Sequence, residues 1–445
     1  MKNTFKLLIV TTGFLLLSCN DFLDEKSNSS LATPETLEDN QALLDRGTVR
    51  SQTPVSGEVS SGDMYVTDAD FNNMPLETEK RLYIWQPERV STPGDNDWGY
   101  TYQRINICNT VLYNLERYGI ANADNVKGQA LVFRAGAYLD AAQVWCQVFD
   151  KNSAGSKHGL PLRLDPDMNI PSVRATLQQT YDQILADLHA ALSLLPPSQI
   201  SATRPSRATA LGYLSRTYLY MGNYEKSLMY GREALVTYNT LLDFNLLNPG
   251  ASFPIAAVNA EVLMPLSMVY SYFLPTNQAK ISAALYDSYA ENDLRKVIFF
   301  RKNAQGEILF KGNYTGNSTR SSGLATDEVY LTVAESYAHT NDYGKAMQVL
   351  NQLLVTRWKA GTFVPYTAGS KEEALQKIRD ERRKELLMRG LRWADLKRYN
   401  RDGANISLTR VVNGVTYVLP PNDPRYAIAI PEDIIKMTGI PQNER

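Results

Sequence analysis

Cys19 is the residue whose chemistry is clearest from its neighbours. A basic start precedes an apolar run over residues 7–17, which closes in Leu16-Leu17-Ser18-Cys19. About a dozen apolar residues are too few to cross a bilayer of about 30 Å as a helix, and this pattern is typical of a cleaved export signal. A thiol placed here can carry a thioether-linked diacylglycerol that anchors the chain in a membrane. We therefore predict a lipoprotein signal peptide over residues 1–18 and lipid attachment at Cys19, with an ordinary signal peptide and a chance cysteine as the alternative.

Residues 19–35 are expected to form a flexible tether behind the lipid. Three acidic residues lie within residues 20–25, and residues 26–33 are rich in Ser and Asn with nothing to bury. Such a composition cannot offset the entropy lost on ordering a chain.

The rest of the chain offers little for catalysis or metal binding. His158, His189 and His339 lie in unrelated settings without the spacing of a zinc site. We find neither a GxSxG motif, nor a Ser/His/Asp setting, nor a carboxylate pair spaced as glycosidases require. We therefore predict no enzyme activity, no catalytic residue and no cofactor beyond the lipid on Cys19, and leave a structural calcium ion open.

Charge and cysteine content also limit the function classes. The net charge is −1, from 46 basic and 47 acidic residues, so no overall field directs the chain onto nucleic acid or anionic lipid. Cys108 and Cys146 both lie in helical contexts. Two buried free thiols are favoured there, and a disulfide stays open as the alternative.

Most of the chain is expected to be helical. Apolar residues recur at steps of three and four over residues 98–115 and again over 123–150, which predicts an antiparallel helix pair. A short helix over 36–50 precedes this pair, and a further helix over 175–195 follows it. Residues 51–97 carry aromatics but no clear periodicity, and we expect an irregular functional surface there. Four tryptophans on helical stripes are assigned to the core: Trp98, Trp145, Trp358 and Trp393.

A diverged internal repeat is the most informative pattern. Residues 208–235 and 329–354 each read as a helix, a tight turn, a tyrosine and a second helix, with Tyr224 and Tyr343 in equivalent places. This is the tetratricopeptide-like plan, in which the tyrosine after the turn packs the two helices. Unrelated amphipathic helices are the alternative.

Three further segments complete the prediction. Residues 241–323 break the helical rhythm and contain strand-like stretches at 297–300 and 308–310. The charged run over 371–399, with the i,i+4 pairs Asp380–Lys384 and Glu385–Arg389, is expected to be a solvated helix face. Asn413-Gly414 between two apolar runs predicts a hairpin.

Taken in order, these residues resemble the SusD/RagB family of outer-membrane lipoproteins of Bacteroidetes. The resemblance rests on motifs along nearly the whole mature chain: Cys19 with its acidic follow-on, Trp98 through Asn109, Arg134-Ala135, Asp293-Leu294-Arg295, Glu381-Arg382, Glu385-Leu386, Gly390, Arg392, Asp395-Leu396 and Ile430-Pro431. After Ile434 the chain differs from the family, because it lacks the usual Asn-Pro-rich ending.

The resemblance implies a mainly α fold, a SusD-like array of tetratricopeptide-like helix pairs with an irregular insertion and a few short strands. It implies a single domain over residues 36–445, with helix pairs at about 98–238 and 327–400 and irregular binding segments at about 51–97 and 241–323. It also implies display on the outer face of the outer membrane. There the chain would capture oligosaccharides and pass them to a SusC-type TonB-dependent transporter. A peptide-capturing relative and a lipid-anchored scaffold for envelope assembly are the alternatives.

Glycan binding would use exposed aromatic faces with amide, carboxylate or guanidinium groups beside them. Two irregular stretches offer this combination. In the first, Tyr65, Tyr83 and Trp85 lie near Asp63, Asp68 and Asn72; in the second, Tyr270, Tyr272 and Phe273 lie near Asn277. These six aromatics are the predicted ligand-binding residues, and core packing is the alternative for each.

Overall fold

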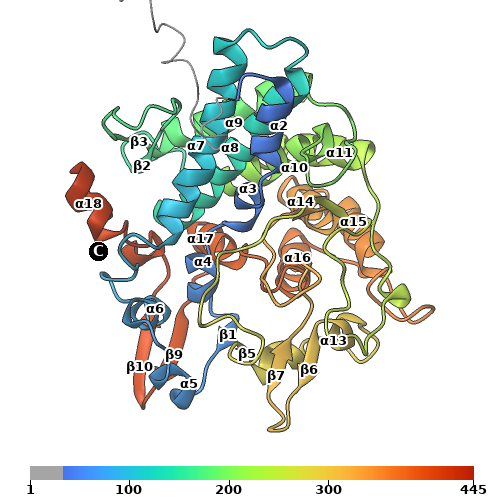
Figure 1. Cartoon of the computed structure of the whole chain (residues 1–445). Coiled ribbons are helices and arrows are strands. Elements are labelled where there is room, and N and C mark those ends of the chain that lie inside the picture. The colour runs from blue at the N-terminus through green and yellow to red at the C-terminus, as the bar shows by residue number, and fades with distance from the viewer. Residues whose placement is uncertain (1–33) are drawn as a thin grey trace, which may run out of the picture.

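The computed structural model describes residues 34–445, which are mainly α-helical (Figure 1). The strands are few and short, so the predicted fold class is confirmed. The predicted signal peptide, the lipid site Cys19 and nearly all of the tether lie outside the described residues. Within residues 34–445, none of the helices combines the length and the apolar character that a membrane span requires.

The longer helices form a stacked array. They are α7 (Asp97–Arg117), α8 (Asp124–Trp145), α9 (Leu177–Leu194), α10 (Arg207–Met221), α11 (Tyr224–Thr237), α14 (Thr326–His339), α15 (Tyr343–Leu354), α16 (Lys371–Glu385) and α17 (Arg392–Arg401). Consecutive helices pack together, α7 on α8, α8 on α9, α10 on α11 and α14 on α15. In addition α11 contacts α14, and α14 contacts α16. Stacking of this kind buries the apolar face that a helix pair leaves uncovered.

The two predicted repeat units are the helix pairs α10–α11 and α14–α15. In the first turn Gly222 adopts φ 74° and the side chain of Asn223 caps α11. In the second turn Asn341 adopts φ 66° and the side chain of Asp342 caps α15. A left-handed residue followed by a side-chain cap reverses the chain within a few residues. The two units therefore share one turn geometry, as the repeat predicts.

The tyrosine after each turn differs between the units. The ring of Tyr224 stacks on His339 of the second unit, with centroids 3.6 Å and planes 1° apart. Its hydroxyl donates to the Asp402 carboxylate at 2.7 Å. Tyr224 therefore joins one unit to the next, whereas Tyr343 is 37% exposed.

Short helices fill the N-terminal part of the described chain. They are α2 (Leu37–Asp45), α3 (Gly47–Ser51), α4 (Ser56–Ser60), α5 (Asp68–Asn72) and α6 (Glu77–Tyr83). The helix expected over 36–50 breaks at Arg46, where ψ is 139°. Segment 51–97, expected to be irregular, holds α4 to α6. The side chains of Thr67 and Asp70 form a capping box that starts α5. Helices this short show too few turns for periodicity to reveal them.

The strands form small antiparallel sheets. β1 (Met64–Tyr65), β5 (Lys280–Ile281), β7 (Ile308–Phe310) and β6 (Phe300–Lys302) make a four-stranded sheet in that order. The remaining strands pair as β2 (His158–Pro161) with β3 (Arg174–Thr176), β4 (Val262–Met264) with β8 (Leu324–Ala325), and β9 (Leu408–Val412) with β10 (Val415–Leu419). The short helices α12 (Ala283–Asp287) and α13 (Arg295–Ile298) and the 3-10 turn η3 (Phe244–Leu246) lie between strands in the chain, whereas the 3-10 turn η4 (Pro424–Tyr426) and helix α18 (Glu432–Thr438) follow β10.

Local turn geometry explains two of these elements, the β9–β10 hairpin and helix α13. Asn413 and Gly414 have φ values of 50° and 77° and connect β9 to β10, which confirms the predicted hairpin. Val297, expected in a strand, belongs to α13 instead. The Asp293 carboxylate accepts from the backbone N–H of Arg295 at 3.0 Å, which starts a helical turn there, and β6 begins only at Phe300.

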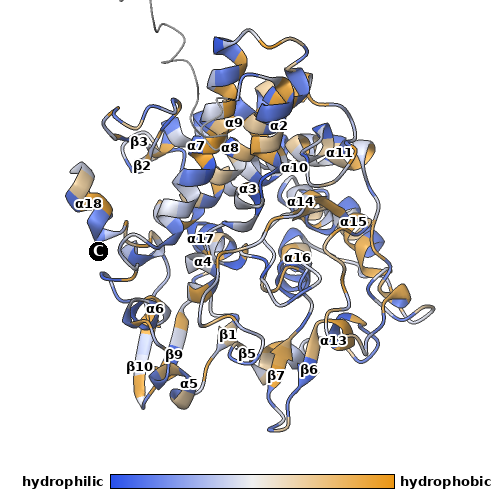
Figure 2. Cartoon of the chain, in the orientation of Figure 1, coloured by the Kyte–Doolittle hydropathy of each residue, from blue (hydrophilic) through white to orange (hydrophobic). Residues whose placement is uncertain are grey.

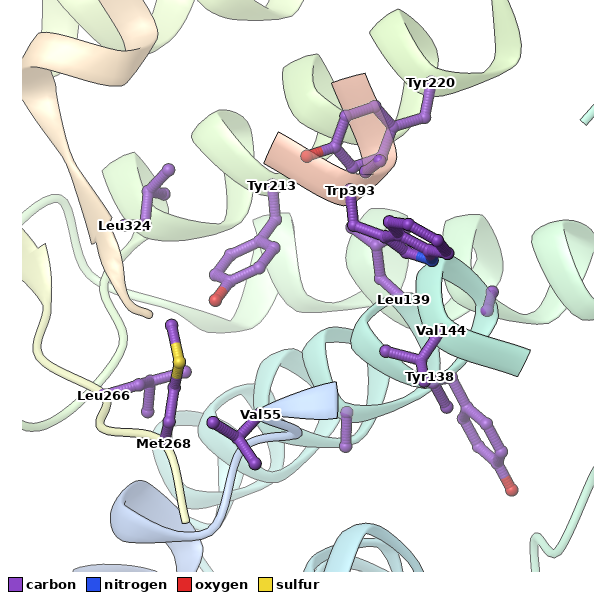
Figure 3. Close-up of a cluster of buried hydrophobic side chains, with 14 of the residues drawn as sticks. Val55, Tyr138, Leu139, Val144, Tyr213, Tyr220, Leu266, Met268, Leu324 and Trp393 are labelled. Carbon is purple, nitrogen blue, oxygen red and sulfur yellow. The ribbon is translucent and has the colours of Figure 1, made fainter. Parts of the chain in front are cut away.

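One part of the hydrophobic core lies where helices α8, α10 and α17 meet the segment around residues 266–268 (Figure 3). Met268 and Leu266 come from that segment, Tyr213 from α10 and Trp393 from α17. The indole N–H of Trp393 donates to the carbonyl of Tyr426 at 3.2 Å. The core thus joins the insertion to the helical array.

The remaining tryptophans follow the prediction. Trp98 and Trp145 are buried, with ring centroids 5.1 Å apart in a T-shaped contact. Trp358 is partly buried and packs on Phe363 in a second hydrophobic cluster.

Both cysteines of the described chain are buried free thiols, which confirms the favoured interpretation. Burial raises the pKa of Cys108 to about 12 and that of Cys146 to about 11. Thiols with such pKa values and no access to solvent react slowly.

Helices α16 and α17 contradict the prediction of a solvated charged face. Figure 2 colours both helices largely hydrophilic. Nevertheless Glu381, Arg382 and Glu385 of α16 are buried, as are Asp395 and Arg398 of α17. Sequence spacing cannot distinguish charges that face water from charges that face partners on other elements.

The partners of these charges lie far away in the chain. Arg295 contacts Asp293, Glu381 and Glu385 at 2.6 to 3.0 Å. Glu385 also pairs with Arg357 at 2.7 Å, so the predicted pair Glu385–Arg389 is wrong. Each buried carboxylate is thereby compensated, which offsets the desolvation of the charges.

Other charged residues of α16, α17 and the loop between them also have partners of opposite charge. Arg398 pairs with Glu335 at 2.5 Å, and Arg389 pairs with Asp327 at 2.5 Å. Lys384 pairs with Glu381 at 2.5 Å rather than with Asp380. The network therefore ties α16 and α17 to α14 and to the insertion.

Candidate functional site

The surface has several cavities. The cavity at the junction of the two predicted binding stretches has the lining that best suits a ligand. Its volume is about 530 Å³, and its lining comes from residues 51–59, 76–82, 90–100 and 269–272. These are parts of both predicted segments, 51–97 and 241–323. We call this hollow the aromatic cavity.

Two exposed tyrosines stand at the aromatic cavity. Tyr270 is 69% exposed and Tyr272 is 39% exposed, and their ring centroids lie 5.1 Å apart in a T-shaped contact. Both residues were predicted as ligand contacts. Their rings offer apolar faces beside polar groups, the combination that binds sugar rings.

Glu79 holds this tyrosine pair in place. Its Oε2 accepts from the Ser271 hydroxyl at 2.8 Å and from the backbone N–H of Tyr272 at 3.0 Å. Helix α6, which carries Glu79, is thereby joined to the loop that carries the tyrosines. Burial raises the pKa of Glu79 to about 7.

The start of α7 forms another wall. The Asn96 side chain accepts from the backbone N–H of Gly99 at 3.0 Å and caps the helix. The Asp97 carboxylate accepts from the backbone N–H of Val55 at 2.9 Å and from the hydroxyl of Ser56 at 2.5 Å. Burial raises the pKa of Asp97. These bonds fix α4 against α7 beneath the cavity.

Sequence reasoning missed Tyr100 and Asp95, which also line the aromatic cavity. The Tyr100 hydroxyl donates to Asp95 Oδ1 at 2.5 Å. A signal was available: Tyr100 follows Trp98 by two positions, so it lies on the opposite face of α7 from the apolar stripe. An aromatic on the polar face of a helix is a candidate surface contact.

For three of the predicted ligand-binding residues, the structure favours the alternative of core packing. Tyr83, Trp85 and Phe273 are buried and do not line the aromatic cavity. The rings of Tyr83 and Phe273 stack on each other, and the Trp85 indole N–H donates to the carbonyl of Ser60 at 3.1 Å. The Arg410 guanidinium lies over the rings of both Tyr83 and Trp85. These residues build the support of the site.

Tyr65 stays a candidate on exposure alone. It is 41% exposed on β1, opposite Lys280 of β5, and does not line the aromatic cavity.

The polar groups predicted beside Tyr65 have structural partners. Asp63 is buried and pairs with Arg383 at 2.9 Å. Asp68 accepts from the backbone N–H of Asn413 at 2.8 Å, and the Asn72 amide bonds the Asn413 side chain. Asp68 and Asn72 thereby fix the β9–β10 turn. Asn277, predicted beside the tyrosine pair, is exposed and does not line the aromatic cavity.

Three buried carboxylates lie close enough together to be considered as a calcium site. Oxygens of Glu261, Asp327 and Glu385 lie within 4.8 Å of one another. However, Arg357 pairs with both Glu261 and Glu385, at 3.0 and 2.7 Å, and Arg389 pairs with Asp327. The guanidinium groups already supply the positive charge, so these residues do not fit a cation.

A second cavity, of about 500 Å³, lies between the start of α7, β2 and α18. Its lining includes Met168, Ile434, Met437 and Ile440. It is mostly apolar, and although Trp98, Tyr100 and Tyr102 also line it, none of its lining residues in the described chain is acidic, so we place the candidate ligand site in the aromatic cavity.

Family models match two parts of the sequence. Residues 21–219 match a model described as starch-binding and associating with the outer membrane, and residues 299–444 match the model of the SusD family. The curated SusD-like protein P2 of Formosa agariphila is 28% identical over 155 residues, which are 34% of this chain. The chain spans 28% of the length of that relative.

Solved structures share the fold over nearly the whole chain. A putative sugar binding protein from Bacteroides vulgatus aligns with a TM-score of 0.75 and 20% identity, covering 93% of this chain and 99% of that one. A SusD superfamily protein from Bacteroides thetaiotaomicron aligns with a TM-score of 0.74 and 21% identity, covering 92% and 100%. At these identities the likeness describes the fold alone.

Proposed function

The chain belongs to the SusD/RagB family, and on that premise we propose that it is a surface-exposed nutrient-binding lipoprotein that captures oligosaccharides. In this proposal the lipid on Cys19 anchors it in the outer membrane, facing the cell exterior. The captured sugar passes to a SusC-type TonB-dependent transporter. The chain itself is a binding protein and not an enzyme.

One observation carries the proposal. Tyr270 and Tyr272 are exposed at a cavity of about 530 Å³ whose other walls carry hydroxyls, amides and carboxylates. Aromatic faces pack on the apolar C–H side of a sugar ring, while polar groups at the rim satisfy its hydroxyls. The volume falls within the range of about 300 to 1,000 Å³ that small-molecule ligands occupy.

Hydrogen bonds between the walls of the cavity favour a binding site that is formed before the ligand arrives. Glu79 holds the loop of Tyr272 from one side. The hydroxyls of Thr78 and Thr92 bond each other at 3.0 Å and connect α6 to the segment before α7. A site whose walls are already fixed loses little entropy when a ligand binds.

Two of the names found in the comparisons point the same way. The aligned protein from Bacteroides vulgatus is called a putative sugar binding protein, and the model matching residues 21–219 is described as starch-binding. We extend this to the present chain as a proposal. Maltooligosaccharides are accordingly the first ligands to test.

A binding panel tests the proposal. The chain carrying Cys19→Ser, which cannot be acylated, is titrated with neutral oligosaccharides and with peptides of similar size. We expect saturable binding of at least one oligosaccharide. Binding of peptides alone would favour the peptide-capturing alternative, and binding of neither would favour the scaffold alternative.

The transporter partnership needs a separate measurement. The acylated chain is purified from its native membrane under mild detergent, and co-purifying proteins are identified. We expect a TonB-dependent barrel in stoichiometric amount. Recovery of the chain without such a barrel would contradict the delivery step and leave the binding step standing.

A further inference from the structure

The charges that line the aromatic cavity all have one sign. Its ionisable acids are Glu79, Asp95 and Asp97. Among residues 34–445, none of those lining the cavity is Lys, Arg or His. A ligand that enters this cavity therefore meets carboxylates and no lining cation.

The two cations that flank Glu79 in the sequence are bound elsewhere. The Lys80 ammonium donates to the carbonyl of Asn72 at 3.1 Å, and the Arg81 guanidinium donates to the carbonyl of Glu88 at 2.9 Å. These side chains flank Glu79 in α6, yet neither lines the cavity. These two cations are thus bound outside the cavity lining.

The three carboxylates are placed at different depths. Asp97 is buried beneath the cavity, Glu79 is half-buried in its wall and Asp95 is exposed at its rim. Hydrogen bonds hold each of them, to Ser56, Ser271 and Tyr100 respectively. Burial raises the pKa of Glu79 to about 7, so that this group carries part of its charge at neutral pH.

This arrangement treats ligands differently by charge. A sugar hydroxyl or ammonium can donate to these oxygens. A uronate or sulfate brings a like charge into a cavity whose described lining has no guanidinium or ammonium to compensate it, and close like charges weaken binding. The discrimination comes from a repulsive element as well as from attraction.

We propose that the aromatic cavity takes uncharged or amine-bearing oligosaccharides and rejects those that carry uronate or sulfate groups. The inference rests on the proposed function, since it names the class of sugar that this site captures.

Matched sugars test it. Maltoheptaose, cellohexaose and mannohexaose are compared with their forms in which the 6-hydroxyls are oxidised to carboxylates or replaced by amines, by calorimetric titration of the Cys19→Ser chain. For each sugar that binds, we expect the carboxylate form to bind at least about tenfold more weakly. The amine form should bind at least as tightly as the parent.

A charge-only variant identifies the cause. In Glu79→Gln/Asp95→Asn each new amide oxygen can still accept the bonds from Ser271, Tyr272 and Tyr100 while the charge is lost. We expect the ratio of parent to carboxylate affinity to fall about tenfold. The control Glu116→Gln/Glu372→Gln removes two exposed acids that do not line the cavity and should leave the ratio as it is.

The outcomes separate the two proposals. If a neutral sugar binds and its carboxylate form binds equally well, the charge selection is wrong while sugar capture stands. An unchanged ratio in the charge-only variant also overturns the inference. If none of the sugars binds in any form, sugar capture fails and the inference fails with it.

Discussion

The ring of Tyr83 stacks on the ring of Phe273, with centroids 4.6 Å apart and planes 10° apart. The two residues come from the two predicted binding stretches, and both are buried. The stretches therefore do meet, but they meet through a core contact. The exposed tyrosines Tyr270 and Tyr272 lie just before Phe273 and are presented at the cavity by this buried stack.

Truncation of the stack should destabilise the protein. Phe273→Ala removes a fully buried ring, and such changes lower the free energy of unfolding by roughly 3–5 kcal/mol. Urea unfolding of the variant measures the loss. If stability were unchanged while sugar binding disappeared, Phe273 would be a ligand contact and its assignment to the core would be wrong.

The buried guanidinium of Arg295 should be needed for stability. Arg295→Met leaves Asp293, Glu381 and Glu385 without this counter-charge, and breaking a buried pair in this way destabilises by roughly 3–5 kcal/mol. We expect Arg295→Lys to rescue only partly, because an ammonium lacks the planar fork of donors. Wild-type stability in Arg295→Met would contradict the role of the network.

Glu58 should make stability depend on pH. Burial and the neighbouring Asp63 raise its pKa from 4.5 to about 7, so the folded state binds this proton more tightly than the unfolded chain. The stability that it contributes is fully present below about pH 4.5 and is lost as pH rises through 7.

The variant Glu58→Gln isolates this effect, since an amide oxygen can still accept from the backbone N–H of Gly390, a bond of 2.8 Å. Between pH 4.5 and 8 the wild type should lose roughly 2–3 kcal/mol relative to the variant. Denaturant unfolding at both pH values gives the difference. A difference that is independent of pH would show that Glu58 does not hold its proton in the folded state.

The two cysteines provide a chemical check of the core. In the Cys19→Ser chain, Cys108 and Cys146 should not react with an aromatic disulfide reagent in the native state and should react fully in denaturant without reductant. Failure to react in denaturant would indicate a disulfide. Fast reaction in the native state would contradict their burial.

Local patterns account for the part of the fold that the sequence predicts. The stripe from Trp98 along α7, the repeated turns before Tyr224 and Tyr343, and the Asn413-Gly414 hairpin each depend on residues a few positions apart. Such features are set by helix periodicity, by capping and by turn geometry. They could be predicted because no distant partner decides them.

Partners far apart in the chain decide what the sequence could not predict. Glu385 looks like a surface helix residue until Arg357 and Arg295 are placed beside it. Likewise Tyr272 and Phe273 are neighbours of similar type, yet one ring is exposed and the other buried. Only the packing of the 266–273 segment on α6 distinguishes them.

The most direct test of the central claim is a calorimetric comparison of Tyr272→Ala with Tyr113→Ala, using the oligosaccharide that binds best. Tyr113 is a matched control, because it is 43% exposed on α7 and does not line the aromatic cavity. Loss of a stacking ring should weaken binding by about 1–2 kcal/mol or more, roughly tenfold in Kd, in Tyr272→Ala alone. Equal affinities of the two variants would contradict the assignment of the aromatic cavity as the sugar site.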